Sequence, residues 1–211
     1  MAVATRGWPP LKRSVIFLSS VIALVSYRYL FGLGAVPRTV LANAYFHGWA
    51  LVHATSAATA LLIGPFQFMA RLRQSRPTVH RVTGVIYVSA CLAGGVSALP
   101  LALGSAAGHV ASAGFLALGT AWMATTAIAV QRIAAGKIAD HGRWMARSFA
   151  LTLSALTLRV DLFVSGMLGM DYFVAYPIIA WACWLPNMLV LEWYLGFCLQ
   201  PETASNSHGS P

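Results

Sequence analysis

Charged residues are scarce in this sequence: they make up 9% of its 211 residues, and only five are acidic. A soluble domain carries about 25% charged residues, because its surface must face water. The shortage therefore argues against a water-soluble fold. Hydrophobic residues form 58% of the chain instead, and the charges gather in short stretches between long apolar runs. This distribution predicts an integral membrane protein surrounded by the lipid bilayer.

Cysteine is also rare, and the chain lacks the common catalytic motifs. Cys91, Cys183 and Cys198 lie inside apolar runs without paired spacing, which excludes a disulfide framework and a cysteine-rich metal motif. We find no nucleophile–base pair and no phosphate-binding loop. The net charge of +9 does not indicate nucleic acid binding, because the basic residues stand at the ends of apolar segments.

Six apolar segments are long enough to cross about 30 Å of hydrocarbon at 1.5 Å per residue. They cover residues 14–34, 44–70, 79–103, 108–133, 144–168 and 172–199. We expect a single all-α bundle domain over residues 1–200, with helices two to five as a four-helix core. The polar tail over residues 201–211 is expected to be disordered. No A-x-A-like cleavage site follows the first segment, so we interpret it as a retained helix.

The basic residues predict the orientation of the segments. Positive charge collects in the N-terminal flank and in the second and fourth connections, at Arg6, Lys12, Arg13, Arg71, Arg73, Arg76, Arg81, Arg132, Lys137, Arg143 and Arg147. The other connections hold a single arginine, Arg38. Because lysine and arginine favour cytoplasmic loops, both termini are expected to face the cytoplasm of a bacterial inner membrane.

The histidines of the core segments are predicted to lie at two depths. His53, or alternatively His47, shares the outer side with His109, whereas His80 and His141 share the cytoplasmic side. A low-spin haem b needs two imidazoles on opposite faces of its iron, and facing bundle helices provide them. The depths thus favour two haems b, one held between the second and fourth helices and one between the third and fifth.

The residues around the histidines leave room for bound haem except at His141, which is followed by the bulky Trp144 and Met145. Ser56, Ala57, Ala60 and Gly64 share the face of His53 and are small, although small faces also serve plain helix packing. Arg159 is expected near the outer level, where it either pairs with Asp161 or a haem propionate or extends to the interface. Arg81 and Arg143 are expected on the cytoplasmic side, as propionate partners or as ordinary flanking charges.

Three segments resemble a bacterial family of predicted membrane proteins, the domain of unknown function 2306 family. They are HATSAATALLIGPFQF, RPTVHRVTGVIYV and HGRWMARSFALTLSALTLR, within residues 53–159. The histidine layout is also similar to that of the ascorbate-reducible dihaem cytochromes b, six-helix proteins whose middle four helices hold two bis-histidine haems. That similarity implies the pairs His53 with His109 and His80 with His141. No motif marks an ascorbate site.

We therefore expect a transmembrane electron carrier or oxidoreductase subunit that receives electrons from a quinol or a cytoplasmic reductant and passes them to a periplasmic partner. One alternative is a small permease with a cavity lined by histidine and arginine, which would need ionisable residues in the bundle and broken helices. Another is a structural subunit of a larger membrane complex without chemistry of its own.

Overall fold

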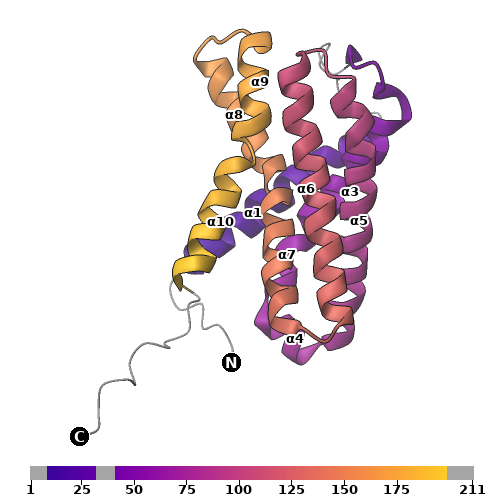
Figure 1. Cartoon of the computed structure of the whole chain (residues 1–211), viewed down its shortest axis with the longest axis vertical. Coiled ribbons are helices and arrows are strands. Elements are labelled where there is room, and N and C mark those ends of the chain that lie inside the picture. The colour runs from indigo at the N-terminus through magenta and orange to yellow at the C-terminus, as the bar shows by residue number, and fades with distance from the viewer. Residues whose placement is uncertain (1–8, 32–40, 199–211) are drawn as a thin grey trace, which may run out of the picture.

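The computed structural model describes residues 9–31 and 41–198, and the regular elements in these ranges are all helices. Figure 1 shows their arrangement. They are α1 (Pro9–Ser26), η1 (Tyr27–Tyr29), α3 (Phe46–Gln67), α4 (Ala70–Ser75), α5 (Pro77–Leu103), α6 (His109–Ala134), α7 (Ile138–Thr152), α8 (Ser154–Met167), α9 (Tyr172–Ala182) and α10 (Leu185–Cys198). The predicted all-α fold is confirmed. The predicted tail over residues 201–211 lies outside the described residues.

Five helical spans among the described residues are long and apolar enough to cross a membrane. They are Gly48–Gln67, Pro77–Leu103, His109–Ala134, Ile138–Met167 and Tyr172–Gly196. The segment predicted over residues 14–34 contains a shorter apolar helix, Arg13–Ser26, which passes into the 3-10 turn η1. Residues 32–34 lie outside the described ranges, so the count of six and the orientation of the ends stay predictions.

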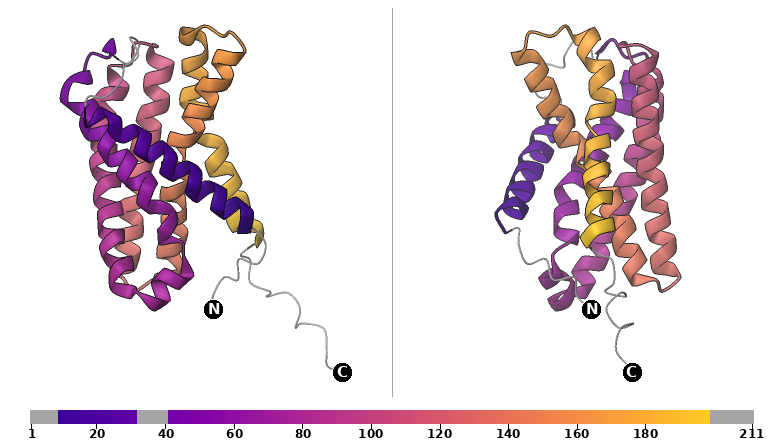
Figure 2. Two further views of the ribbon diagram at one scale, coloured as in Figure 1. Left: turned by 180° about the vertical axis from the view of Figure 1, so that it is seen from behind. Right: turned by 60° about the vertical axis from the view of Figure 1, so that its left-hand side comes forward.

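Four of these helices form the core. α3 packs along α5, α5 along α6, and α6 along α7, while α1 lies across α3 (Figure 2). At one end of the core, here called the arginine end, α4 and the α6–α7 turn carry Arg71, Arg73, Arg76 and Lys137. At the other, the His109 end, α3 begins, α5 ends and α6 begins. Gly136 allows the tight α6–α7 turn because its φ of 72° is one that other residues rarely adopt.

The last two predicted segments are each broken into two helices, which the sequence analysis did not anticipate. α9 ends at Ala182, because Pro186 has no N–H to bind the carbonyl four residues earlier. α7 ends at Thr152, whose hydroxyl donates to the Ser148 carbonyl at 2.9 Å, a back-bond that bends helices. α8 consequently leans away from the core in Figure 1, while α9 packs against α6.

Hydrogen bonds connect the residues around the two breaks. The Thr157 hydroxyl donates to the Cys183 carbonyl, and the Asn187 amide donates to the carbonyls of Ala150 and Cys183 at 3.3 and 3.2 Å. Side chains thus satisfy backbone carbonyls in this region, as the absence of water in the bilayer core demands. Nearer the arginine end, Arg147 ties α7 to α10 by two hydrogen bonds to Glu192, at 2.6 and 2.8 Å.

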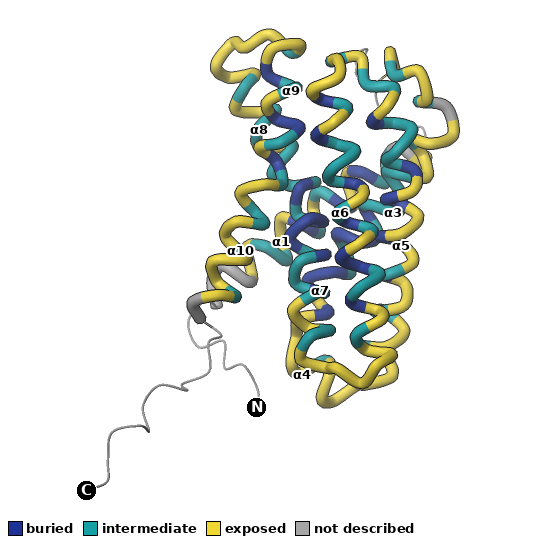
Figure 3. The backbone as a smooth tube through the Cα atoms, viewed as in Figure 1, coloured by how far each residue is buried: buried dark blue, intermediate teal, exposed yellow. Residues whose placement is uncertain are grey.

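Buried residues gather at mid-height, where α1 crosses the core, whereas the outer surfaces are exposed and apolar (Figure 3). Small residues allow the close helix contacts there, as is usual between membrane helices. One of them joins α6 to the backbone of α9, where a Cβ atom placed on Gly114 would lie 2.9 Å from the Ala180 carbonyl oxygen. Lipid covers the apolar exterior of such a bundle.

Candidate functional site

A cavity of about 590 Å³ extends from the His109 end toward mid-height. Helices α3, α5 and α6 form one side of it, and the α8–α9 pair forms the other. Its lining is mostly apolar, with a few polar side chains that include His53, Thr152 and Arg159. Cavities of roughly 300–1,000 Å³ with this composition typically bind small molecules. The lean of α8 thus creates a ligand-sized space inside the protein.

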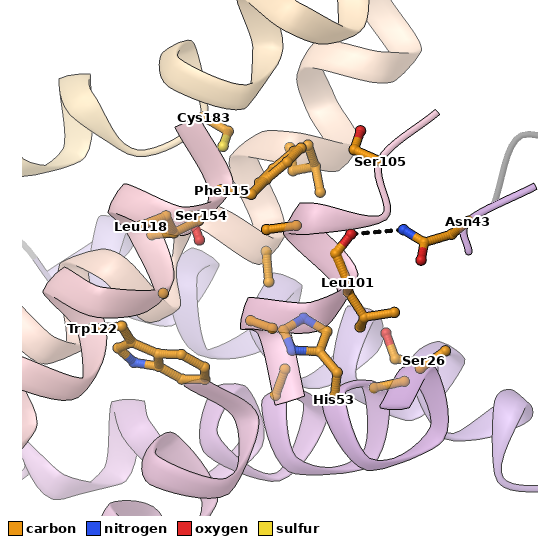
Figure 4. A pocket seen from close by; sticks show the side chains of 18 of the residues that line it. Ser26, Asn43, His53, Leu101, Ser105, Phe115, Leu118, Trp122, Ser154 and Cys183 are labelled. Carbon is orange, nitrogen blue, oxygen red and sulfur yellow. Dashed lines mark hydrogen bonds between the residues drawn. The ribbon is translucent and has the colours of Figure 1, made fainter. Parts of the chain in front are cut away.

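His53 projects into this cavity from α3 (Figure 4). Its Nδ1 lies 2.9 Å from the carbonyl oxygen of Gly94 in α5. A carbonyl oxygen only accepts hydrogen bonds, so Nδ1 carries the proton and Nε2 keeps a lone pair. Gly94 stands close to α6, since a Cβ atom there would lie 3.0 Å from the indole of Trp122. The contact between α5 and α6 therefore fixes the acceptor that orients His53.

A buried network of polar side chains continues from the cavity wall into the core. Trp122 Nε1 donates to the Thr152 hydroxyl at 2.9 Å, and that hydroxyl also lies 2.9 Å from Tyr87 Oη. Tyr87 Oη lies 3.1 Å from the Ser148 hydroxyl, which in turn lies 2.7 Å from that of Thr126. Every member is buried, and the network joins α5, α6 and α7.

The network also aligns two of the predicted haem ligands. His80 and His141 stand seven residues before Tyr87 and Ser148, on α5 and α7. Seven residues are nearly two turns, so each histidine shares a helix face with its network residue. Because the Tyr87–Ser148 contact joins those two faces, the two histidines, here called the facing pair, stand on joined faces about 10 Å nearer the arginine end.

The ring nitrogens of this facing pair differ in their partners. His141 Nδ1 lies 2.8 Å from the Ala129 carbonyl oxygen of α6, so it donates there and Nε2 keeps its lone pair. A backbone carbonyl bonded to the second ring nitrogen is the usual support of a metal-ligating histidine. His80 Nδ1 is buried and has no hydrogen-bond partner among the described residues. The pair thus combines an oriented imidazole with an unsatisfied buried nitrogen.

The histidines predicted at the outer level are not brought together in the same way. His109 is the first residue of α6, is exposed, and does not line the cavity within the described part of the chain. The side chain of His47, the alternative to His53, lies outside the described residues. Of the two predicted pairs, His80 and His141 are the ones that stand on helix faces joined by the polar network.

Arg159 lies on α8 at the edge of the cavity. Its guanidinium donates to the Ser26 hydroxyl of α1 at 2.8 Å and to the Ala155 carbonyl at 2.5 Å. Asp161, considered as its partner from the sequence, has a buried Oδ2 without a hydrogen-bond partner among the described residues. Arg159 and His53 both line the cavity. The cavity thus holds a cationic group and an imidazole.

Arg81 and Arg143 are exposed at the arginine end, each within two residues of a histidine of the facing pair. Arg143 lies 4.0 Å from Asp140 of the same helix. Their positions suit either of the roles considered for them. No group of three histidine, cysteine or acidic side chains able to hold a metal ion occurs in residues 9–31 and 41–198. An iron already held by a porphyrin needs only two axial ligands.

Several residues of the site escaped the sequence analysis. Trp122, Thr152 and Tyr87 resemble ordinary apolar-helix residues in the sequence, and their roles depend on contacts between three helices. One signal was available, since Tyr87 and Ser148 share the spacing of seven residues from His80 and His141. A search for polar residues on the histidine faces would have found both.

The fold and this cavity define a multi-pass α-helical membrane protein with a ligand-sized space inside its bundle. Residues 50–195 match the family model described as predicted membrane protein DUF2306, and the chain belongs to that family. The matched region contains the core helices from Ala50 onward, the α8–α9 pair and most of α10. Neither curated proteins nor solved structures gave a match to the chain.

Proposed function

We propose that this protein is an electron carrier of the bacterial inner membrane that holds a b-type haem between His80 and His141. The carrying observation is the Tyr87–Ser148 contact, which turns the histidine faces of α5 and α7 toward each other. His141 keeps the lone pair of Nε2 available for a ligand role, because Nδ1 donates to the Ala129 carbonyl. Coordination through His80 Nδ1 would also give a partner to that buried nitrogen, which has none among the described residues.

The chain supplies the surroundings that such a group requires. The exposed guanidinium groups of Arg81 and Arg143 stand at the level where propionates would emerge from the bundle. Buried side chains around Tyr87 keep water from the inner side of the pair, and burial of this kind tunes a haem potential. The bound haem would supply reversible one-electron chemistry.

The proposal covers one haem at the arginine end rather than the two expected from the sequence. A second haem in the cavity would require His109 to join His53, and His109 lies outside the cavity. The positive charge at the arginine end favours a cytoplasmic location for this end, with both termini on the same side.

An absorbance spectrum tests the proposal. Protein purified from cells supplied with a haem precursor is expected to show a Soret band that shifts on reduction, together with the sharp bands of low-spin haem b. Extracted pigment should be close to one haem per chain. Colourless protein that is fully folded and inserted in the membrane would rule the proposal out.

A second candidate function is that of a small permease. It is favoured because two membrane spans, α7–α8 and α9–α10, are each broken into two helices. Discontinuous helices that border a cavity near mid-membrane are typical of transporters, and α7–α8 and α9–α10 both border or adjoin this cavity. If this candidate is right, colourless protein in vesicles will accumulate a substrate, and Arg159→Gln will stop the uptake. Uptake unaffected by Arg159→Gln argues against it, because the cavity would then play no part.

A further inference from the structure

We propose that the cavity binds the aromatic ring of a membrane-soluble quinol. This inference deepens the proposed electron-carrier function and rests on it, because a quinol is a source of electrons within the bilayer. It gives His53 a role in ligand binding that does not require a second histidine to share a haem iron with it. Three properties of the cavity carry it: the shape of its walls, the hydrogen-bonding character of His53, and its access from lipid.

The walls suit a flat ring. Trp122 contributes a buried indole whose N–H is held by Thr152, so its plane is fixed. Tyr176 stacks on Tyr172 with ring centroids 4.7 Å apart and contacts Phe115 at 5.3 Å. Across from these aromatic residues, α3 presents small side chains, among them Ala57 and Ala58. Aromatic rings favour such neighbours, because offset and edge-on contacts add to the gain from burial.

The hydrogen-bonding character of His53 selects the reduced form of the ligand. Its Nδ1 proton is used by Gly94, so Nε2 acts only as an acceptor while the ring is neutral. A quinol hydroxyl donates to such an atom, whereas a quinone carbonyl only accepts and would face its lone pair. Arg159 lines the same cavity and adds a positive charge, which favours an electron-rich oxygen at the other edge of the ring.

Access from the bilayer follows from the residues at the side of the cavity. Leu51 of α3 lines the cavity and is 43% exposed. Ser26 of α1 and Leu158 of α8 border the same side, where Figure 2 shows α1 crossing α3 and where α1 also contacts α8. A ligand dissolved in lipid therefore reaches His53 without crossing water, and an apolar tail can remain among the lipid chains.

Electrons from a quinol bound in the cavity would have a short route through the protein to the proposed haem site. Trp122 and Thr152 line the cavity and are bonded through Tyr87 to Ser148, two turns above the facing histidines. The cavity and the proposed haem site thus share one buried network. The quinol binds with its hydroxyl on His53 Nε2.

Calorimetric titration of the purified full-length chain in nanodiscs tests the inference. A short-chain benzoquinol, kept reduced without oxygen, is expected to bind more tightly than the matching benzoquinone. His53→Ala should weaken quinol binding about tenfold, the value of one lost hydrogen bond in a buried site. His109→Ala is the matched control, since His109 is exposed outside the cavity, and should change the affinity less than about twofold.

A second variant and a second readout separate the outcomes. Ala57→Phe fills the cavity from α3 and should abolish quinol binding, even if His53→Ala fails to fold. The haem absorbance should persist in His53→Ala and Ala57→Phe, so failure of this inference is distinct from failure of the haem proposal. Equal quinol affinity in wild type and Ala57→Phe, or tighter binding of quinone than quinol, would overturn it. Loss of haem absorbance in both variants would overturn it as well, because haem would then occupy the cavity.

Discussion

His141→Ala is expected to eliminate the low-spin haem spectrum. The substitution removes the imidazole whose Nδ1 is held by Ala129 and whose Nε2 is the proposed haem ligand. Supporting residues of metal-ligating histidines already change affinity by about 10–100-fold, so loss of the ligand itself should lower the haem retained per chain by at least about tenfold. The measurement is the reduced-minus-oxidised absorbance per mole of purified protein. His80→Ala is expected to give the same result.

The outer-level histidines provide the controls for this experiment. His109→Ala removes an exposed imidazole of the same kind and should leave the spectrum intact. His53→Ala should also retain it, since that ring lies in the cavity and not in the facing pair. If His53→Ala and His109→Ala each remove half of the haem, the two-haem arrangement expected from the sequence is correct and the single-haem proposal is not.

Gly114→Ala is expected to destabilise the protein, although alanine is the better helix former. The new methyl group would lie 2.9 Å from the carbonyl oxygen and 3.0 Å from the carbonyl carbon of Ala180, and a backbone cannot rotate out of the way. Overpacking of this kind costs about 1–3 kcal/mol, which exceeds the gain of about 1 kcal/mol in helix propensity at its upper end. The expected fall in melting temperature is about 2–6 °C for a chain of this size.

Gly142→Ala supplies a matched control for that prediction. Gly142 also lies within a helix, but nothing stands within 4 Å of a Cβ atom placed there. The same substitution should therefore raise the melting temperature slightly, by about 1–3 °C. Opposite signs for the two variants would confirm the close α6–α9 approach, whereas a rise for both would contradict it.

The sequence predicted well which segments form the helices of the core. Long apolar runs fix the helices because a membrane-spanning backbone must satisfy its own hydrogen bonds, and Pro65 and Pro100 did not alter that outcome. The breaks at Leu153 and Cys183 were not predicted. One depends on a hydroxyl back-bond and the other on Pro186, and neither interrupts the hydropathy of its segment.

The candidate site was predicted in part, for a related reason. Depth follows from residue number along a spanning helix, so the levels of His80 and His141 could be counted from the sequence. The direction in which a side chain points depends on how each helix is rotated against its neighbours. His109 illustrates this limit, because its number places it at the end of α6 but does not reveal that it faces outward. Contacts such as Tyr87 with Ser148 settle the rotation.

The break at Leu153 also solves a problem of hydrophobic mismatch. The 30 residues from Ile138 to Met167 would measure about 45 Å as one straight helix, whereas the hydrocarbon layer is about 30 Å thick. A straight helix would have to tilt steeply along its whole length or distort the bilayer. Dividing it lets α7 stay aligned with the core while α8 absorbs the surplus length by leaning outward. The surplus of chain thus produces the vacant volume beside His53.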